Sequence, residues 1–244
     1  MDRVLAESGI ILVDKPEEWT SHDVVNCIRS RFQIRKVGHC GTLDPIATGV
    51  LVIVCGRATT LSSRLTTQDK VYSGTMTLGV ETFTEDRAGE ITAECDPSGV
   101  TEEAVRAVCA KFVGQIEQIP PMVSAIKKGG KTLYKLARKG VVVEREPRPI
   151  TIHSLEVTSI DLPNNVSFTV HCSKGTYVRT LCADIGRELG CGGHMHDLRR
   201  LASGAFMIEN TVTMDQIKSW EREEFLTHMT PLGEVLINLV EQSS

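Results

Sequence analysis

The sequence predicts an α+β fold. Stretches with the alternating or continuous apolar pattern of strands intermingle with segments of helical periodicity, and no strand-helix-strand unit recurs along the chain. With 244 residues, the chain can form one sizeable core with a small appendage, and no internal repeat or low-complexity linker divides it. We therefore expect one main domain in which strands and helices share a core.

The first elements surround a segment of small residues. Residues 9–13 form a short apolar run typical of a strand, and Pro16 ends the pattern because proline lacks a backbone donor. A helix with a basic end follows, capped by Thr20 or Ser21, with apolar residues at helical spacing. Residues 38–49 are rich in turn-forming residues and predict a loop, after which residues 50–55 predict a buried strand.

The middle of the chain predicts a strand, a helix and a basic insertion. Residues 70–78 alternate like a half-buried strand, and Thr101 begins a helix that ends near Gly114. Two prolines then interrupt the pattern at 120 and 121, and residues 132–139 predict a short basic helix that Gly140 ends. This stretch is typical of an insertion.

The last third predicts a hairpin, a helix and a final strand. Strands are expected at 151–160 and 166–173, joined by a turn at the Asn164-Asn165 pair. We expect a helix over 177–189, a strand over 198–208 and a last helix that begins at Thr213.

Composition excludes some classes of protein. Apolar residues make up 41% and charged residues 24% of the chain, and no apolar run approaches the roughly 18 residues that cross a bilayer. The first eight residues include three charged ones and lack the apolar core of a signal peptide. We therefore expect a cytoplasmic protein with no membrane partner.

Charge is distributed unevenly along the chain. The formal net charge is -4, but residues 127–148 carry a local charge of +6 and residues 81–103 a local charge of -7. One face could therefore contact phosphate while another faces solvent. Two solvated charged segments are the alternative that charge alone leaves open.

The eight cysteines indicate neither disulfides nor a metal site. Their spacing is irregular and contains no Cys-x-x-Cys pair, so reduced, buried thiols are the better interpretation. The most metal-like cluster is Cys191-Gly-Gly-His194-Met-His196, which lacks a matching second half. We expect no metal.

The stretch from Gly38 to Leu51 is the most informative one. It reads Gly-His-Cys-Gly-Thr-Leu-Asp-Pro-Ile-Ala-Thr-Gly-Val-Leu, in which glycines permit tight turns and Pro45 stiffens the chain directly after a single carboxylate, Asp44. By itself, an Asp before Pro is more often a turn residue that satisfies its own backbone.

Five ordered motifs change that interpretation. Together with the stretch around Asp44, the chain contains Asp-Lys-Pro at 14–16, Lys-x-Tyr at 70–72, Ser-Lys-Gly-Thr-Tyr-x-Arg-Thr at 173–180 and Leu-Arg-Arg-Leu at 198–201. This set resembles the TruB family of pseudouridine synthases in order and spacing, over roughly residues 9–213. The resemblance implies a mixed, largely antiparallel sheet flanked by helices, with a central RNA-binding cleft and a thumb insertion.

The resemblance also implies a reaction. The expected activity is isomerisation of the uridine at position 55, in the T loop of tRNA, to pseudouridine, with Asp44 as the covalent nucleophile. The conversion is redox-neutral and involves no net hydrolysis, so we expect no cofactor. Whether Asp44 attacks the sugar or first forms a base adduct stays open.

The family's other functional residues match positions of this chain. By resemblance, Arg179 pairs with the Asp44 carboxylate, and Tyr72 stacks on the target base and is a candidate proton relay. The resemblance further implies that His39 occupies the space that the flipped base leaves. It also implies that Leu201 lines the base pocket and that Lys15 supports the floor of the active site. Lys70 completes the predicted substrate-binding set of this core.

The basic insertion matches the family's thumb, a segment that closes on the T loop. Phosphate contacts are expected from four lysines: Lys128, Lys131, Lys135 and Lys139. We expect a catalytic domain over residues 1–212 with the thumb at about 120–150, and a helical extension over 213–244 that is too short for the PUA-type RNA-binding domain of many relatives. The expected partner is the T arm of tRNA, and the expected state is a monomer.

Two other function classes stay open. A noncatalytic RNA-binding or tRNA-folding module could use the same cleft, although Asp44, Tyr72 and Arg179 are all present. A retaining glycosidase would need a second, acidic carboxyl group, and these motifs contain none.

Overall fold

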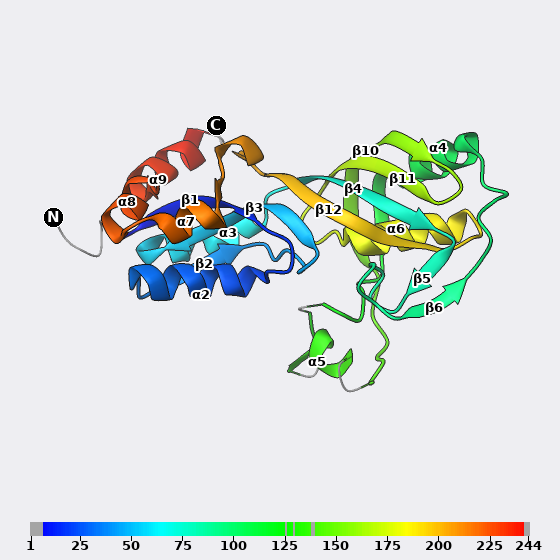
Figure 1. Ribbon diagram of the computed structural model, residues 1–244, viewed down its shortest axis with the longest axis horizontal. Coiled ribbons are helices and arrows are strands. Elements are labelled where there is room, and N and C mark those ends of the chain that lie inside the picture. Colours follow the sequence, from blue (N-terminus) through cyan, green and yellow to red (C-terminus); the bar gives the residue numbers. More distant parts are fainter. Residues whose placement is uncertain (1–6, 125, 129, 138–139, 242–244) are drawn as a thin grey trace. The chain divides into compact units, whose positions relative to one another are not determined.

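The computed structural model describes residues 7–124, 126–128, 130–137 and 140–241 (Figure 1). The chain forms two compact units: residues 1–70 with 199–244, and residues 71–198. It passes from one unit to the other inside two strands, β4 (Lys70–Leu78) and β12 (Gly193–Ser203).

The first unit is built on strands β1 (Gly9–Lys15) and β3 (Ala47–Cys55), which pair antiparallel along their length. Strand β2 (Val37–Cys40) pairs antiparallel with β3, and β1 pairs parallel with β14 (Val212–Thr213) and antiparallel with β15 (Thr230–Pro231). Side chains from 50 to 55 in β3 are fully buried. The predicted strands at 9–13 and 50–55 are confirmed, and the sheet is mixed as expected.

Helix α2 (Ser21–Phe32) covers this unit with an apolar face that includes Val24 and Ile28. Its N-cap is Thr20, which forms a capping box with Asp23. The remaining helices are η1 (Gly56–Leu61), α3 (Ser62–Thr66), η2 (Ile208–Asn210), α7 (Met214–Ser219), α8 (Arg222–Thr227) and α9 (Leu232–Glu241). The predicted caps at Thr20 and Thr213 are both confirmed, but the helix that Thr213 caps is not the last one, because α8 and α9 follow it.

The second unit orders its strands β12-β4-β11-β10-β7. Strand β10 (Arg148–Asp161) pairs antiparallel with β11 (Asn165–Cys172), as the predicted hairpin requires, and with β7 (Gly114–Gln118). Helices α4 (Glu102–Lys111) and α6 (Val178–Glu188) contact each other, and α4 also contacts β10. A separate hairpin pairs β5 (Val80–Thr82) with β6 (Ile91–Glu94).

The predicted insertion leaves this unit on two extended connections (Figure 1). It contains the strands β8 (Lys127–Lys128) and β9 (Lys131–Thr132) and the helix α5 (Leu133–Ala137). Residues 138 and 139, which the sequence placed at the end of this helix, lie outside the described residues.

Three sequence predictions are wrong in detail. The expected loop over 38–49 is a hairpin whose connection is limited to residues 41–46, because residues 37–40 pair with 52–55. The expected strand over 198–208 begins at Gly193 and ends at Ser203, where Gly204 turns the chain at φ +57°. Strands β5, β6 and β7 were not predicted.

The cysteines behave as expected of reduced thiols. Among the described residues, which include every cysteine, no disulfide is formed, and all but Cys27 and Cys95 are buried. In the Cys191 to His196 cluster, the imidazole Nδ1 of His194 lies 2.9 Å from the carbonyl of Val80. No helix in the described part of the chain is long and apolar enough to cross a membrane.

Candidate active site

Asp44 lies half-buried in the tight connection between β2 and β3. The flanking backbone is fixed by hydrogen bonds: the amide of Leu43 donates to the hydroxyl of Ser21 at 2.9 Å, and the amide of Glu18 donates to the carbonyl of Pro45 at 2.9 Å. The amide of Ala47 donates to the carbonyl of Asp44 at 3.0 Å, which closes the turn. The backbone on both sides of the carboxylate is therefore anchored.

Lys15 also binds the backbone of the turn that holds Asp44. Its fully buried ammonium donates to the carbonyls of Pro16 at 2.8 Å, Trp19 at 2.7 Å and Pro45 at 3.3 Å. Burial lowers the pKa of Lys15 to about 8, while the negative charge of Asp44 opposes that shift. The ammonium thus binds the backbone beside Asp44 and adds positive charge there, and the predicted support of the active-site floor stays a prediction.

Arg200 holds the two ends of the loop. Its buried guanidinium donates from Nε to the carbonyl of Val50 at 2.6 Å and from Nη2 to the carbonyl of Gly41 at 3.1 Å. Gly49 has a φ of +100°, and a Cβ there would lie 2.2 Å from the carbonyl oxygen of Arg200. Only glycine allows strand β3 to approach Arg200 this closely.

Arg199 links two of the sequence motifs. It forms a two-point ion pair with Asp14, at 3.0 Å and 2.7 Å, and donates to the hydroxyl of Thr48 at 3.3 Å. Neither this arginine nor Arg200 was predicted as a site residue, although both lie in the Leu-Arg-Arg-Leu motif. That motif was the signal that could have found them.

His39 precedes the loop on strand β2 and is half-buried. Burial lowers the pKa of its imidazole, and the positive charge of Arg200 lowers it further. The Nδ1 atom is buried and has no hydrogen-bond partner among the described residues. A neutral ring in this position suits the predicted contact with a displaced base better than a charged one. Leu201 follows Arg200 in β12 and is half-buried.

Lys70 and Tyr72 are alternate residues of β4, on the strand that joins the two units. Lys70 is buried, and its ammonium donates to the carbonyls of Thr66, at 2.7 Å, and Gln68. These contacts favour a role in fixing the turn before β4, and the predicted contact with substrate stays a prediction. Tyr72 is 8% exposed and lies in the second unit.

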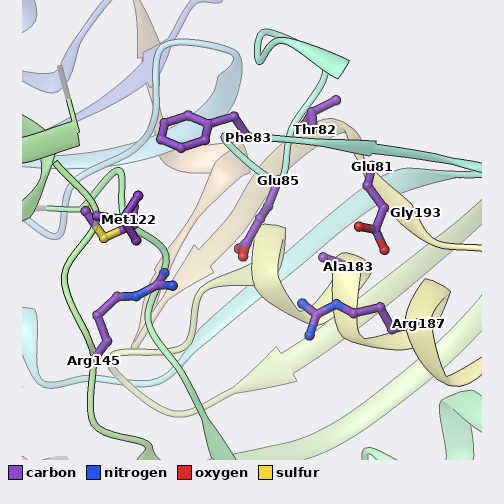
Figure 2. A pocket seen from close by; sticks show the side chains of 10 residues that line it. Glu81, Thr82, Phe83, Glu85, Met122, Arg145, Ala183, Arg187 and Gly193 are labelled. Carbon is purple, nitrogen blue, oxygen red and sulfur yellow. The ribbon is translucent and has the colours of Figure 1, made fainter. Parts of the chain in front are cut away.

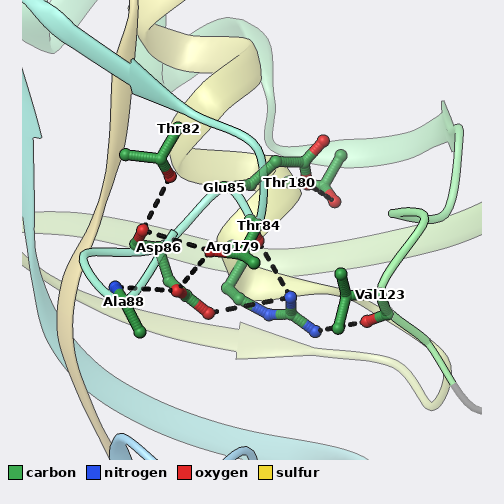
Figure 3. A network of polar contacts seen from close by, with 8 residues as sticks. All are labelled: Thr82, Thr84, Glu85, Asp86, Ala88, Val123, Arg179 and Thr180. Carbon is green, nitrogen blue, oxygen red and sulfur yellow. Dashed lines mark hydrogen bonds and ion pairs between the residues drawn. The ribbon is translucent and has the colours of Figure 1, made fainter. Parts of the chain in front are cut away.

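Arg179, in the first turn of α6, is held at three points (Figure 3). Its guanidinium donates to the carbonyls of Thr84 at 2.9 Å and Val123 at 3.0 Å, and pairs with the carboxylate of Asp86 at 3.7 Å. Asp86 in turn accepts from the hydroxyl of Thr84 at 2.6 Å and the amide of Ala88 at 3.0 Å. The predicted partner of Arg179, Asp44, belongs to the other unit, and that pairing stays a prediction.

The segment around Asp86 corrects one interpretation of charge. Residues 81–103 were read as an acidic segment facing solvent, but Asp86 is buried and Glu85 is half-buried. Glu85 has a φ of +62° and accepts from the hydroxyl of Thr180 at 2.5 Å. Burial raises the pKa of Glu85, and the bond from Thr180 and the charge of Arg179 oppose the shift. Asp86 is the main site residue that the sequence interpretation missed.

The predicted phosphate contacts are described only in part. Lys135 is exposed on α5, and the backbones of Lys128 and Lys131 lie in β8 and β9. Lys139 lies outside the described residues. Arg145, on the return connection, donates to the carbonyl of Pro120 at 2.9 Å and so joins the two connections of the insertion.

Comparison with known proteins places this geometry in a family. A model of the TruB family pseudouridylate synthase N-terminal domain matches residues 29–178, and one of the tRNA pseudouridylate synthase B C-terminal domain matches residues 179–237. The chain belongs to the TruB family. The TruB match includes Asp44 and Tyr72 and ends directly before Arg179.

Relatives of the TruB chain are similar over most of its length. It is 49% identical over 229 residues to a tRNA pseudouridine synthase B of Syntrophotalea carbinolica, covering 94% of this chain and 74% of the relative. It is 44% identical over 232 residues to a tRNA pseudouridine synthase B of Opitutus terrae, covering 95% of this chain and 96% of that one.

Solved structures confirm the predicted TruB-type fold. A Cbf5-Nop10-Gar1 complex contains a chain that matches with a TM-score of 0.71 and 31% identity over 94% of this chain, which spans 62% of that longer chain. An H/ACA RNP bound to a substrate RNA containing 2′-deoxyuridine matches with a TM-score of 0.68 and 27% identity, over 95% of this chain and 61% of the other. The α+β pseudouridine synthase fold is thus confirmed.

Proposed function

We propose that this TruB chain converts uridine 55 in the T loop of tRNA to pseudouridine, with Asp44 as the covalent nucleophile. The observation that carries this proposal is the fixed turn around Asp44. A half-buried carboxylate stands on a loop whose backbone is bound by Ser21, Lys15 and Arg200. Such anchoring holds a nucleophile in one orientation. A fixed orientation lowers the barrier to forming a covalent bond, whereas an ordinary solvated turn gains little from it.

The reaction balances without a redox partner. The bond from N1 of the base to C1′ of the ribose breaks, and a bond from C5 to C1′ forms after the base has rotated. The proton on C5 is lost, and N1 gains one. Asp44 forms and then releases a covalent bond, which divides one difficult step into two easier ones. Lys15 adds positive charge near Asp44.

Arg179 and Tyr72 complete the proposed catalytic set. Their proposed roles are pairing with the Asp44 carboxylate for Arg179, and stacking on the target base and proton relay for Tyr72. The contacts with Thr84, Val123 and Asp86 support the role of Arg179, because they fix the orientation of its guanidinium within the second unit.

The proposed RNA contacts are of two kinds. The lysines of the thumb bind phosphates, while shape and stacking select the nucleotide. His39, with its lowered pKa, fills the space of the flipped base as a neutral ring, and Leu201 lines the pocket. Within this proposal the T arm of tRNA is the substrate, residues 1–212 are the catalytic domain, and the protein acts as a cytoplasmic monomer.

Incubation with a T-arm transcript, followed by nucleoside analysis, tests the proposal. Pseudouridine without free uracil is the expected result. Free uracil instead would identify a glycosidase, and unmodified RNA that is nevertheless bound would identify a noncatalytic RNA-binding module. The exposed variant Asp96→Asn is the control for the Asp44 variants, since Asp96 lies outside the motifs.

A further inference from the structure

The second unit contains a cavity of about 360 Å³ that the proposed chemistry does not use (Figure 2). It is bounded by the start of the β5–β6 hairpin, the base of the thumb and helix α6. Its main side chains are Glu81, Phe83, Glu85, Met122, Arg145 and Arg187. Pockets for small ligands begin at about 300 Å³, so the cavity can hold one planar base.

The cavity shares two walls with the Arg179 network. Thr84 and Asp86 contact Arg179, whereas Glu85 between them lines the cavity, because its φ of +62° turns the chain at this point. In the other wall, the carbonyl of Val123 accepts from Arg179 and the adjacent Met122 lines the cavity. A ligand in the cavity would therefore touch the same two segments that hold Arg179.

Two polar groups of the cavity lack a partner among the residues that the structure describes. The carboxylate of Glu81 makes no hydrogen bond or ion pair with any residue that the structure describes. The Nε atom of Arg145 is buried without an acceptor among the described residues. In Figure 2 the guanidinium of Arg145 points toward Glu85, and the Glu81 carboxylate points toward Arg187. The buried Nε of Arg145 costs free energy unless a ligand or a water satisfies it, whereas the half-buried Glu81 carboxylate is open to a ligand.

We propose that this cavity binds a guanine base of the RNA substrate, a nucleotide close to the target uridine. The inference rests on the proposed function and adds a second point of recognition to it. Guanine carries N1–H and N2–H₂ donors on one edge, which a carboxylate such as Glu81 accepts. Its O6 and N7 acceptors on another edge match a guanidinium such as that of Arg145.

The apolar side chains and the spacing support this ligand class. Phe83 is 42% exposed and Met122 is buried, so an aromatic ring and a thioether are both available to pack on a base. Ala183, which also lines the cavity, follows Arg179 by one turn of α6, about 6 Å along the helix axis. That offset fits a neighbouring nucleotide rather than the target base itself.

The test uses T-arm stem-loop RNAs in which each loop guanine is replaced, one at a time, by inosine, which lacks the N2 amino group. With the unmodified protein, one replacement should raise the Kd about tenfold, roughly 1.4 kcal/mol. Glu81→Ala should reduce that discrimination to less than about twofold. The control Glu94→Ala, on the same hairpin but outside the cavity, should keep it.

A second variant, which fills the cavity, and a second probe, a free guanine nucleotide, test the cavity independently of Glu81. Ala183→Leu places a larger side chain in the cavity without changing its charge, and should also abolish the discrimination. Guanosine monophosphate should bind to the unmodified protein and not to Glu81→Ala in a calorimetric titration. The proposal is overturned if the ratio of Kd values for inosine-substituted and unmodified RNA is the same in Glu81→Ala, Ala183→Leu and the unmodified protein. It is also overturned if an active, unmodified protein shows no such difference in Kd. Absence of pseudouridine from the unmodified protein would instead contradict the proposed function, and nucleotide binding would still report on the cavity.

Discussion

Arg179 binds three groups at once, two carbonyls and a carboxylate that lie on different segments of the second unit. Lysine keeps the charge but has no planar fork, so Arg179→Lys cannot satisfy these acceptors together. We expect single-turnover pseudouridine formation at saturating RNA to fall about 100-fold, roughly 2.7 kcal/mol, while RNA affinity changes less than threefold.

Arg106→Lys is the matched control for this substitution, because Arg106 is exposed on helix α4, outside the proposed sites, and its guanidinium donates to the carbonyl of Val157 at 3.4 Å. It should leave turnover within about twofold. Turnover within about twofold in Arg179→Lys as well would mean that the three contacts of Arg179 do not serve catalysis.

The buried ammonium of Lys15 should give the protein a distinctive pH dependence of stability. Its pKa is lowered from 10.5 to about 8 in the folded protein, so between these values the unfolded chain holds a proton that the folded chain has lost. The contribution of Lys15 to stability therefore rises with pH across this window. The free energy of unfolding of the unmodified protein, minus that of Lys15→Met, should increase from about pH 8 to about pH 10.5.

The difference between the two proteins isolates Lys15, because the cysteine thiols that titrate in the same range cancel. Chemical denaturation at several pH values measures it. A difference that stays constant or falls across the window would show that the ammonium is not disfavoured by its burial.

Among single residues, the motifs predicted Asp44, Lys15 and Arg179 as site residues, and their roles stay predictions. The structure adds the partners that these side chains bind. Asp86 was missed because it lies in an acidic segment whose composition favours solvent, and only the fold turns it toward Arg179. Arg199 and Arg200 were missed because their partners, Asp14 and the carbonyls of Gly41 and Val50, are distant in sequence.

Among the elements, the β2–β3 hairpin sets the position of the Asp44 turn, and Gly49 is its most constrained residue. An alanine at 49 would need a φ of +100° and a Cβ 2.2 Å from a backbone oxygen of Arg200. We expect Gly49→Ala to reduce the free energy of unfolding by at least about 2 kcal/mol, combining backbone strain and a displaced strand.

Gly99→Ala is the matched control, since nothing lies within 4 Å of the Cβ that it would add. Denaturant unfolding of both variants should show a change of less than about 0.5 kcal/mol for the control. Equal stabilities of the two variants would mean that strand β3 adjusts freely beside Arg200.

The thumb is the element that should determine RNA affinity. Changing Lys128, Lys131, Lys135 and Lys139 to Glu places negative charges where phosphates are expected, so affinity should fall steeply. If two or three of these lysines contact phosphate, the log-log salt slope should lose about 2 units, at roughly 0.7 to 0.9 per contact. Single-turnover rates at saturating RNA should change much less.

Binding titrations at several salt concentrations measure this effect, with Lys111→Glu as a control on the exposed end of α4. Unchanged affinity and slope in the fourfold variant would leave residues 127–148 as a solvated charged segment. The RNA would then have to be bound elsewhere.

Elements with a strong local signal were predicted well, and those that depend on distant partners were not. Helices α2 and α4 have an N-cap and an apolar face in the sequence, and both were found. Strand β2 was not predicted, because Gly38 and His39 are typical of a turn and form a strand only by pairing with β3. Strand β7 was not predicted, because its sequence is mostly polar and it forms a strand by pairing with β10.

At the scale of the whole molecule, the proposed catalytic residues are divided between the units. Asp44 belongs to the first, and Tyr72 and Arg179 belong to the second. The family motifs lie in both units, so the order of motifs along the sequence predicts the set, and the pairing of Arg179 with Asp44 stays a prediction. The division into units was not predicted, because the boundaries fall inside strands β4 and β12, where composition does not change.

The central claim is that the anchored carboxylate of Asp44 is the nucleophile, and Asp44→Asn tests it most directly. Asparagine keeps the size and most hydrogen bonds of aspartate but cannot form the covalent intermediate. In single-turnover assays with a T-arm transcript, we predict that the variant is folded, binds RNA with an affinity within about threefold of the unmodified protein, and forms no pseudouridine. Pseudouridine formed by Asp44→Asn above the level of contaminating activity would contradict the account.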